Sequence, residues 1–230
     1  MYFDPWYFVY IAPALILAFI AQGMVHSAYA RASQIRAKLS GMAAARRILD
    51  SAGLENVDIE QIPGKLTDHY DPRAKVLRLS EDNYHGSSMA AVGIAAHEAG
   101  HAIQDAVRYA PLVIRNIAVP MANFGSSLGM LVFFVGLGFG LQSVAVVGLV
   151  LFAFVAFFQI VNLPVEFDAS ARAKRLLVQE GIIDERELPE VKKVLNAAAL
   201  TYVAATLQSV LTLLYYVSLF MGSQRRESRY

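Results

Sequence analysis

Four long runs without a charged residue constrain the fold of this 230-residue chain more than any other feature of its sequence. They are residues 6–25, 117–141, 144–161 and 197–220, and each falls in the range of about 17–25 apolar residues that crosses roughly 30 Å of hydrocarbon. Hydrophobic residues make up 56% of the chain and charged residues 17%, which is too apolar for an ordinary soluble domain. The sequence therefore predicts a mainly α membrane protein with four transmembrane helices.

The order of these runs predicts which parts of the chain share a side of the membrane. Only Asp4 is charged before the first run, so the basic region of a cleavable signal peptide is missing and we expect an uncleaved helix. Gln142 and Ser143 alone separate the second run from the third, which predicts a tight transmembrane hairpin. Small residues in its first arm should let the two helices approach closely: Gly125, Ser126, Ser127, Gly129, Gly136, Gly138 and Gly140.

Between the first run and the hairpin, the chain is polar enough to form a small water-facing α+β domain. A short helix is expected over residues 40–52, capped by Ser40 and ended by Gly53. Alternating apolar and polar residues predict strands over 57–62 and 75–80. The second strand contains Val76, Leu77, Arg78 and Leu79. It is interpreted either as an edge strand that binds an extended peptide or as a plain structural hairpin strand.

The sequence His97-Glu98-Ala99-Gly100-His101 lies in the same polar segment. Two His four residues apart lie on one face of a helix, where both imidazoles can reach one Zn²⁺. Zinc makes a coordinated water acidic enough to lose a proton near neutral pH, and the intervening Glu can accept it and pass it to a leaving amine. The alternative, two buried structural histidines around Glu98, would leave several polar groups unpaired at about 1–3 kcal/mol each.

A third zinc ligand is needed, and the chain has no Cys, so a carboxylate is the natural choice. Glu166 follows the hairpin directly, next to Pro164, which suits the first turn of a helix. Asp168 lies about 200° around that helix and cannot share its face. From residue chemistry alone, Glu166 is either the ligand or simply an anion favourably placed at a helix N-terminus.

Several motifs together resemble the YugP-type zinc-dependent membrane peptidases of bacteria, a neutral zinc metallopeptidase family. They are residues 66–72, 76–80, 97–101, 163–170 and 199–204. More distantly, the chain is similar to the membrane gluzincins of the HtpX and CAAX-protease kind, in which a Glu after a transmembrane hairpin is the third ligand. The resemblance implies Glu166 as that ligand. Those relatives carry an Asp where this chain has Ser170, so Asp105 or Asp168 is expected to orient a ligand histidine instead.

These observations predict four transmembrane helices and a zincin-like domain with a short β-sheet. The expected segments are an N-terminal transmembrane helix (1–26), a metallopeptidase domain (27–116), the hairpin (117–162), a third-ligand helix and loop (163–196), a fourth transmembrane helix (197–221) and a flexible tail (222–230). Basic residues near the membrane ends are more numerous on the catalytic side, so the positive-inside rule places the site at the cytoplasmic face of the bacterial inner membrane.

The leading functional hypothesis is a membrane zinc endopeptidase that acts on protein or peptide substrates. The alternatives are an intramembrane-cleaving protease and a catalytically silent zinc-containing scaffold. The net charge of +1 gives no reason to expect nucleic acid as a partner, and the sequence leaves the oligomeric state open. Candidate donors for the oxyanion are residues of the right type in the water-facing segments: His69, Tyr84, His85, Tyr109 and Arg172.

Overall fold

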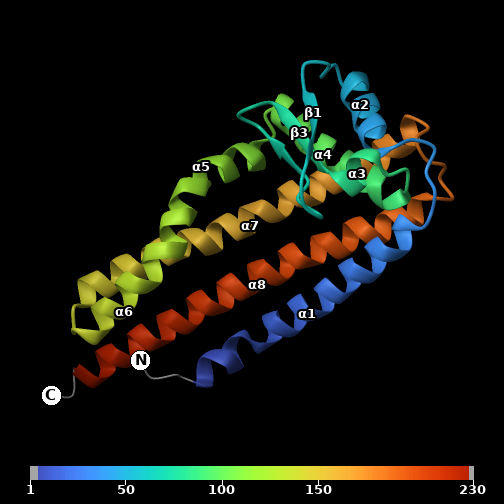
Figure 1. The fold of residues 1–230 in the computed structure, drawn as a ribbon. Coiled ribbons are helices and arrows are strands. Elements are labelled where there is room, and N and C mark those ends of the chain that lie inside the picture. The colour runs from blue at the N-terminus through green and yellow to red at the C-terminus, as the bar shows by residue number, and fades with distance from the viewer. Residues whose placement is uncertain (1–4, 228–230) are drawn as a thin grey trace. The chain divides into compact units, whose positions relative to one another are not determined.

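The computed structural model of the protein describes residues 5–227. It is mainly helical, as the sequence predicts, with one small sheet (Figure 1). The elements in chain order are α1 (Pro5–Ser33), α2 (Gly41–Ser51), β1 (Asp58–Ile62), β2 (His69–Asp71), β3 (Val76–Ser80), α3 (Glu81–His85), α4 (Met89–Ala106), α5 (Ala110–Phe124), the π-helical turn η1 (Gly125–Gly129), α6 (Met130–Gly138), α7 (Gln142–Gln179) and α8 (Leu188–Glu227).

The chain divides into two compact units. The first consists of residues 1–19, 113–163 and 201–230, and the second of residues 20–112 and 164–200. Among the described residues, four helices are long and apolar enough to cross a membrane: Pro5–Ser33, Ala110–Gly138, Gln142–Gln179 and Leu188–Gln224. They contain three of the four predicted runs entirely and the fourth, 117–141, as far as Gly138, so the expected number of transmembrane helices is confirmed by length and composition.

In the first unit, glycines allow the two arms of the hairpin to pack backbone against backbone. A Cβ added at Gly125 would lie 2.1 Å from the Leu151 carbonyl oxygen, and one at Gly136 would lie 2.3 Å from the Ala145 nitrogen. The expected close approach is therefore present. Gly138 has nothing within 4 Å of an added Cβ and takes no part in it. Gly140, with φ of 70°, instead turns the chain between α6 and α7.

The third and fourth long helices extend further than predicted. A helix was expected to begin near Pro164, but α7 runs unbroken from Gln142 to Gln179 with Pro164 inside it. One proline removes a single hydrogen bond, and a long apolar helix tolerates this loss. Glu166 is thus not at a helix N-terminus. Similarly, α8 continues through the expected tail as far as Glu227, and residues 228–230 lie outside the described part.

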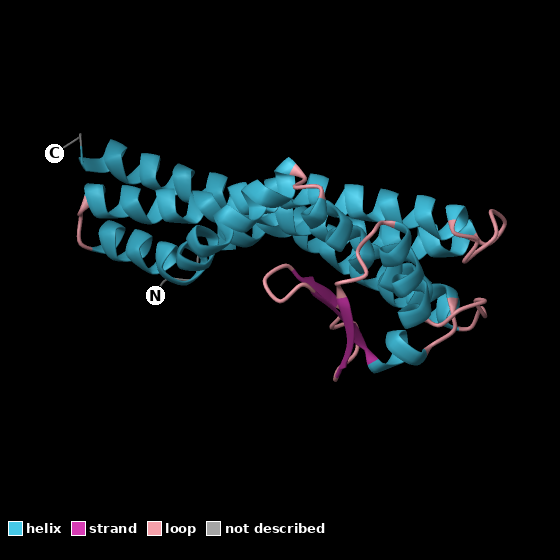
Figure 2. Ribbon diagram, turned by 90° about the horizontal axis from the view of Figure 1, so that it is seen from above, coloured by secondary structure: helices cyan, strands magenta, loops and turns pink. Residues whose placement is uncertain are grey.

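In the second unit, three strands form a sheet, coloured magenta in Figure 2, and their order in the sheet is β1-β3-β2. β1 pairs parallel to β3, with Asp58 opposite Val76, and β2 pairs antiparallel to β3, with Tyr70 opposite Leu77. The predicted edge strand over Val76–Leu79 is therefore wrong, because β3 is the central strand and has a partner on each side. Strand order depends on long-range pairing, which alternation along one strand does not encode. The hairpin interpretation is the better one, since β3 pairs with β2.

The core of the second unit forms around α4. Twelve of its 18 residues are buried, as expected for a helix that is apolar on nearly all sides. Ala90, Val92 and Ala95 of this helix join Ile48 and Leu49 of α2 and Leu77 of β3 in one cluster. The predicted cap of α2 is present, since the Ser40 side chain accepts from the Ala43 N–H. α4 is thereby held on several sides, and side chains along it have fixed positions.

Candidate metal centre

The two histidines of the site are placed by the regular geometry of α4. Ser88 caps the helix by accepting a hydrogen bond from the Ala91 N–H. This cap and the absence of proline keep the helix regular through His97 and His101, whose rings lie one turn apart with centroids separated by 4.7 Å. Both side chains are 13% exposed. The predicted histidine helix therefore brings both rings to one point.

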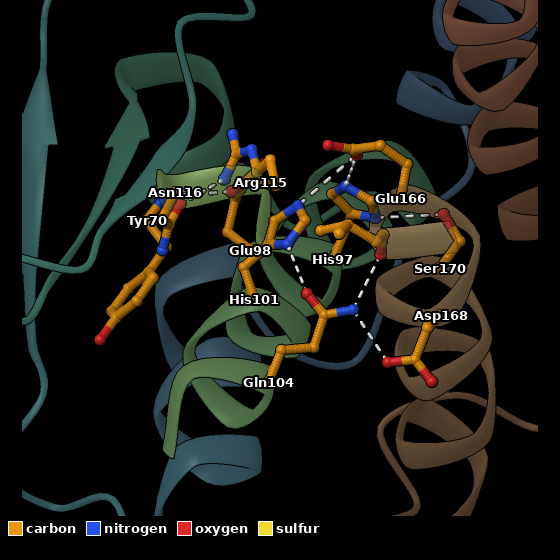
Figure 3. Close-up of polar contacts among 11 residues, drawn as sticks. Tyr70, His97, Glu98, His101, Gln104, Arg115, Asn116, Glu166, Asp168 and Ser170 are labelled. Atoms are coloured by element: carbon orange, nitrogen blue, oxygen red, sulfur yellow. Dashed lines mark hydrogen bonds and ion pairs between the residues drawn. The ribbon is translucent and has the colours of Figure 1, made fainter. Parts of the chain in front are cut away.

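Glu166 of α7 meets these rings at their Nε2 atoms (Figure 3). Its Oε2 lies 3.2 Å from His97 Nε2 and 3.5 Å from His101 Nε2. One ligand atom from each of the three residues lies within 4.8 Å of the others, and Glu166 is only 5% exposed. Among the residues described, no other His, Asp or Glu joins this cluster.

The arrangement suits zinc in its chemistry and in its charge. Two imidazole nitrogens and one carboxylate oxygen are a common zinc donor set that leaves a coordination position open. Burial lowers the pKa of His101, but the hydrogen bond with Glu166 and the charges of Glu98 and Glu166 outweigh it, so that the pKa is raised. The surroundings thus favour a positive charge where the ligand atoms converge, which a metal ion would supply.

The remaining ring nitrogens of both histidines have partners that the sequence did not single out. Ser170 Oγ lies 3.1 Å from His97 Nδ1, and Gln104 Oε1 lies 3.0 Å from His101 Nδ1. The signal for each was spacing: Ser170 lies one turn after Glu166, and Gln104 lies three residues after His101. Ser170, which stands where the resembling families carry an Asp, itself contacts His97, a candidate metal ligand.

The two acidic residues proposed to orient the histidines have different positions. Asp105 accepts from the Tyr70 hydroxyl at 2.8 Å and from Lys75, so it is occupied by the β2–β3 hairpin and not by a histidine. Asp168 lies off the ligand face of α7, as expected, and reaches His101 only through Gln104. The prediction for Asp105 is therefore wrong, and that for Asp168 holds only indirectly.

Glu98, the proposed general base, is buried beside β2. Its Oε2 accepts a hydrogen bond of 3.1 Å from the main-chain N–H of Tyr70. Burial raises the pKa of the Tyr70 phenol, and the hydrogen bond to Asp105 raises it further, so the phenol stays protonated and keeps donating. Tyr70 thereby holds β2, an edge strand of the sheet, to α4 through two hydrogen bonds, one to Asp105 and one to Glu98.

The five candidate oxyanion donors have partners elsewhere or belong to other packing contacts. His69 is exposed and its Nδ1 lies 2.9 Å from the Thr67 carbonyl oxygen, while His85 contacts Gln61. Tyr84 stacks edge-on with His85. Arg172 donates to Asp168 and lies over the Tyr109 ring. The donor that stabilises the oxyanion stays a prediction.

Comparison with known proteins agrees with this geometry. The profile of a family described as "Putative neutral zinc metallopeptidase" matches residues 7–221. The chain is 46% identical over 213 residues to "Putative membrane protease YugP" of Bacillus subtilis (strain 168), a match that covers 92% of this chain and 95% of that protein. No solved structure matches the chain.

Proposed function

Because the chain belongs to the neutral zinc metallopeptidase family, we propose that it is an integral-membrane zinc endopeptidase. It would hydrolyse peptide bonds in membrane or membrane-proximal proteins. The observation that carries this proposal is the convergence of His97, His101 and Glu166 on one point, with Glu98 buried on the same helix as the two histidines. These four residues are the parts that a gluzincin mechanism requires.

The three ligands would hold Zn²⁺ through the two Nε2 atoms and a carboxylate oxygen of Glu166. The bound metal would supply Lewis acidity, which acidifies a water molecule and polarises the scissile carbonyl. Glu98 takes the proton of the attacking water and then donates it to the leaving amine. Its Oε2 is held by Tyr70 N–H, so its other oxygen, Oε1, is the natural proton acceptor.

β2 is the strand against which we place the substrate. It is an edge strand, unlike β3, and the side of β2 away from β3 faces Glu98 through the Tyr70 N–H. An extended peptide laid along such an edge is held by main-chain hydrogen bonds, which depend little on its sequence; here they would use groups other than the Tyr70 N–H, which already donates to Glu98. This placement would bring a scissile bond beside Glu98.

The proposed location is the inner membrane of a bacterium, with the metal centre at the cytoplasmic face. Support comes from the positive-inside rule. Arg36, Lys38, Arg108 and Lys174, together with other basic residues of the second unit, outnumber the three arginines that follow Gly222.

Replacing Glu98 by Gln tests the proposed catalysis. Gln keeps the size of Glu98 and can still accept from Tyr70, but it cannot take a proton, so we expect cleavage to slow by about 10²–10⁴-fold. Zinc, measured by elemental analysis of the purified protein, should stay near one per chain. Glu55→Gln, an exposed substitution far along the sequence from the site, is the matched control and should cleave normally.

The wild type should lose activity with a chelator and regain it with added Zn²⁺. Cleavage by Glu98→Gln at the wild-type rate, with contaminating proteases excluded, would refute the mechanism. If Glu98→Gln binds zinc and supports the cellular role of the protein as well as the wild type does, the result would instead point to the silent scaffold. Cleavage positions inside a substrate's membrane span would identify an intramembrane protease.

A further inference from the structure

Gln104 is fully buried in α4 and makes three hydrogen bonds around the metal centre (Figure 3). Its Oε1 lies 3.0 Å from His101 Nδ1. Its Nε2 donates to the Val165 carbonyl oxygen at 2.8 Å and to Asp168 Oδ2 at 2.8 Å. The side chain therefore connects one ligand histidine to two residues of α7 that are close in sequence to Glu166.

The partners of the Gln104 amide determine which way it points. A main-chain carbonyl and a carboxylate accept hydrogen bonds and cannot donate them, so the NH₂ group must face Val165 and Asp168. Its oxygen then faces His101 and can only accept. When the His101 ring is neutral, as a metal ligand must be, its proton is consequently on Nδ1, and the lone pair of Nε2 is free for a metal held between His101 and Glu166.

Asp168 is itself held in place, because Arg172 donates to the same Oδ2 atom. The orientation of the amide is thus fixed from outside the metal centre. Ser170, the partner of His97, differs in this respect. A hydroxyl can rotate and either donate or accept, so Ser170 does not by itself decide which nitrogen of His97 carries a proton.

We propose that Gln104 is a positioning residue of the metal centre. It keeps His101 protonated on Nδ1 with Nε2 toward Glu166, and it fastens α4 to the turn of α7 that carries Glu166. The inference rests on the proposed zinc site and deepens it. Its test measures metal binding and therefore does not depend on whether the protein cleaves peptides.

Gln104→Met is the informative substitution because Met matches Gln in length but neither donates nor accepts strongly. After the substitution Val165 still lies within the helix and Asp168 still accepts from Arg172. The group that mainly loses its hydrogen-bond partner is therefore the Nδ1–H of His101. Loss of such a partner weakens metal binding by about 10–100-fold. The expected result is weaker Zn²⁺ binding by this factor, measured by competition with a chromophoric chelator.

Asn83→Leu is the matched control. Asn83 is also a buried amide of the second unit, but it donates to Asp68 and Ser80, which are not ligands. We expect it to lower the unfolding temperature and to leave zinc affinity within about twofold of wild type. Zinc affinity of Gln104→Met that equals wild type, or falls only as far as in Asn83→Leu, overturns the proposal.

A second measurement needs no substitution at position 104. In zinc-loaded wild type labelled with ¹⁵N-histidine, the His101 signals, assigned by their loss in His101→Ala, should show hydrogen on Nδ1 and metal on Nε2. Metal on Nδ1 would overturn the proposal. If zinc affinity behaves as expected while the wild type cleaves no substrate, the endopeptidase function fails and the role of Gln104 stands.

Discussion

Gly100, between the two histidines of the motif, is a point of close approach between α4 and α7 at the candidate metal centre. A Cβ added there would lie 2.8 Å from the Ala169 carbonyl oxygen, and 3.2 and 3.3 Å from the Ala169 Cα and carbonyl carbon. All three atoms belong to the backbone of α7, which cannot rotate away as a side chain can. Gly100→Ala should therefore push the two helices apart.

The size of the displacement follows from these distances. Ordinary contact begins near 3.4 Å, so the backbones must separate by about 0.6 Å. Zinc ligands tolerate errors of about 0.2 Å. The same movement would stretch the 3.1 Å contact between Ser170 and His97 beyond hydrogen-bonding range. We expect zinc affinity to fall by about tenfold or more, similar to the loss of an orienting partner.

Overpacking of this kind lowers the free energy of unfolding by about 1–3 kcal/mol. For a chain of this size, this corresponds to a fall in the unfolding temperature of about 2–12 °C. The assay is chelator competition for zinc together with thermal unfolding of the metal-free protein. Gly23→Ala in α1 is the control, since nothing lies within 4 Å of its added Cβ. Wild-type zinc affinity and unfolding temperature in Gly100→Ala would refute the argument from close approach.

Two further predictions concern the hairpin of the sheet and the orientation in the membrane. The Ala74 N–H and the Arg78 guanidinium hold the pKa of the Asp71 carboxyl below its usual value. The ionised Asp71 therefore stabilises the folded state above about pH 4, and this contribution is lost as the pH falls further. Thermal unfolding of Asp71→Asn should depend less on pH below 4 than that of wild type, and equal slopes would contradict this. Cysteines introduced at Thr67 and Ser223 should be labelled from opposite sides of intact cells, and external labelling at Thr67 would reverse the proposed orientation.

The sequence was most informative where a local pattern carries the structure. The histidine helix and its buried environment follow from a spacing of four and an apolar context, and the four membrane helices follow from the length of uncharged runs. From residue chemistry alone, Glu166 was either a zinc ligand or an anion at a helix N-terminus, and the family resemblance favoured the ligand. In the structure it contacts both histidines within the α7 helix, which removes the alternative of an anion at a helix N-terminus.

Features that depend on tertiary packing were missed. The central position of β3 depends on pairing with strands on both sides, and one strand's alternation is the same at an edge or in the centre. Helix α7 passes through Pro164 because local preferences are overridden by the rest of the helix. Gln104 was not predicted, because Asp105 was the residue expected to orient a ligand histidine; in the structure Asp105 contacts Tyr70 and Lys75 instead.

The hydrogen bond between Tyr70 and Glu98 has a consequence for how this site tolerates variation. Its donor is a main-chain N–H, which every residue except proline would provide at position 70. The contact with the Glu98 carboxylate thus depends on the path of β2 and not on the identity of a side chain. Substitutions at position 70 would remove the hydroxyl contact with Asp105 but leave this N–H in place, so a mutational scan there will miss the contact with Glu98 unless proline is included.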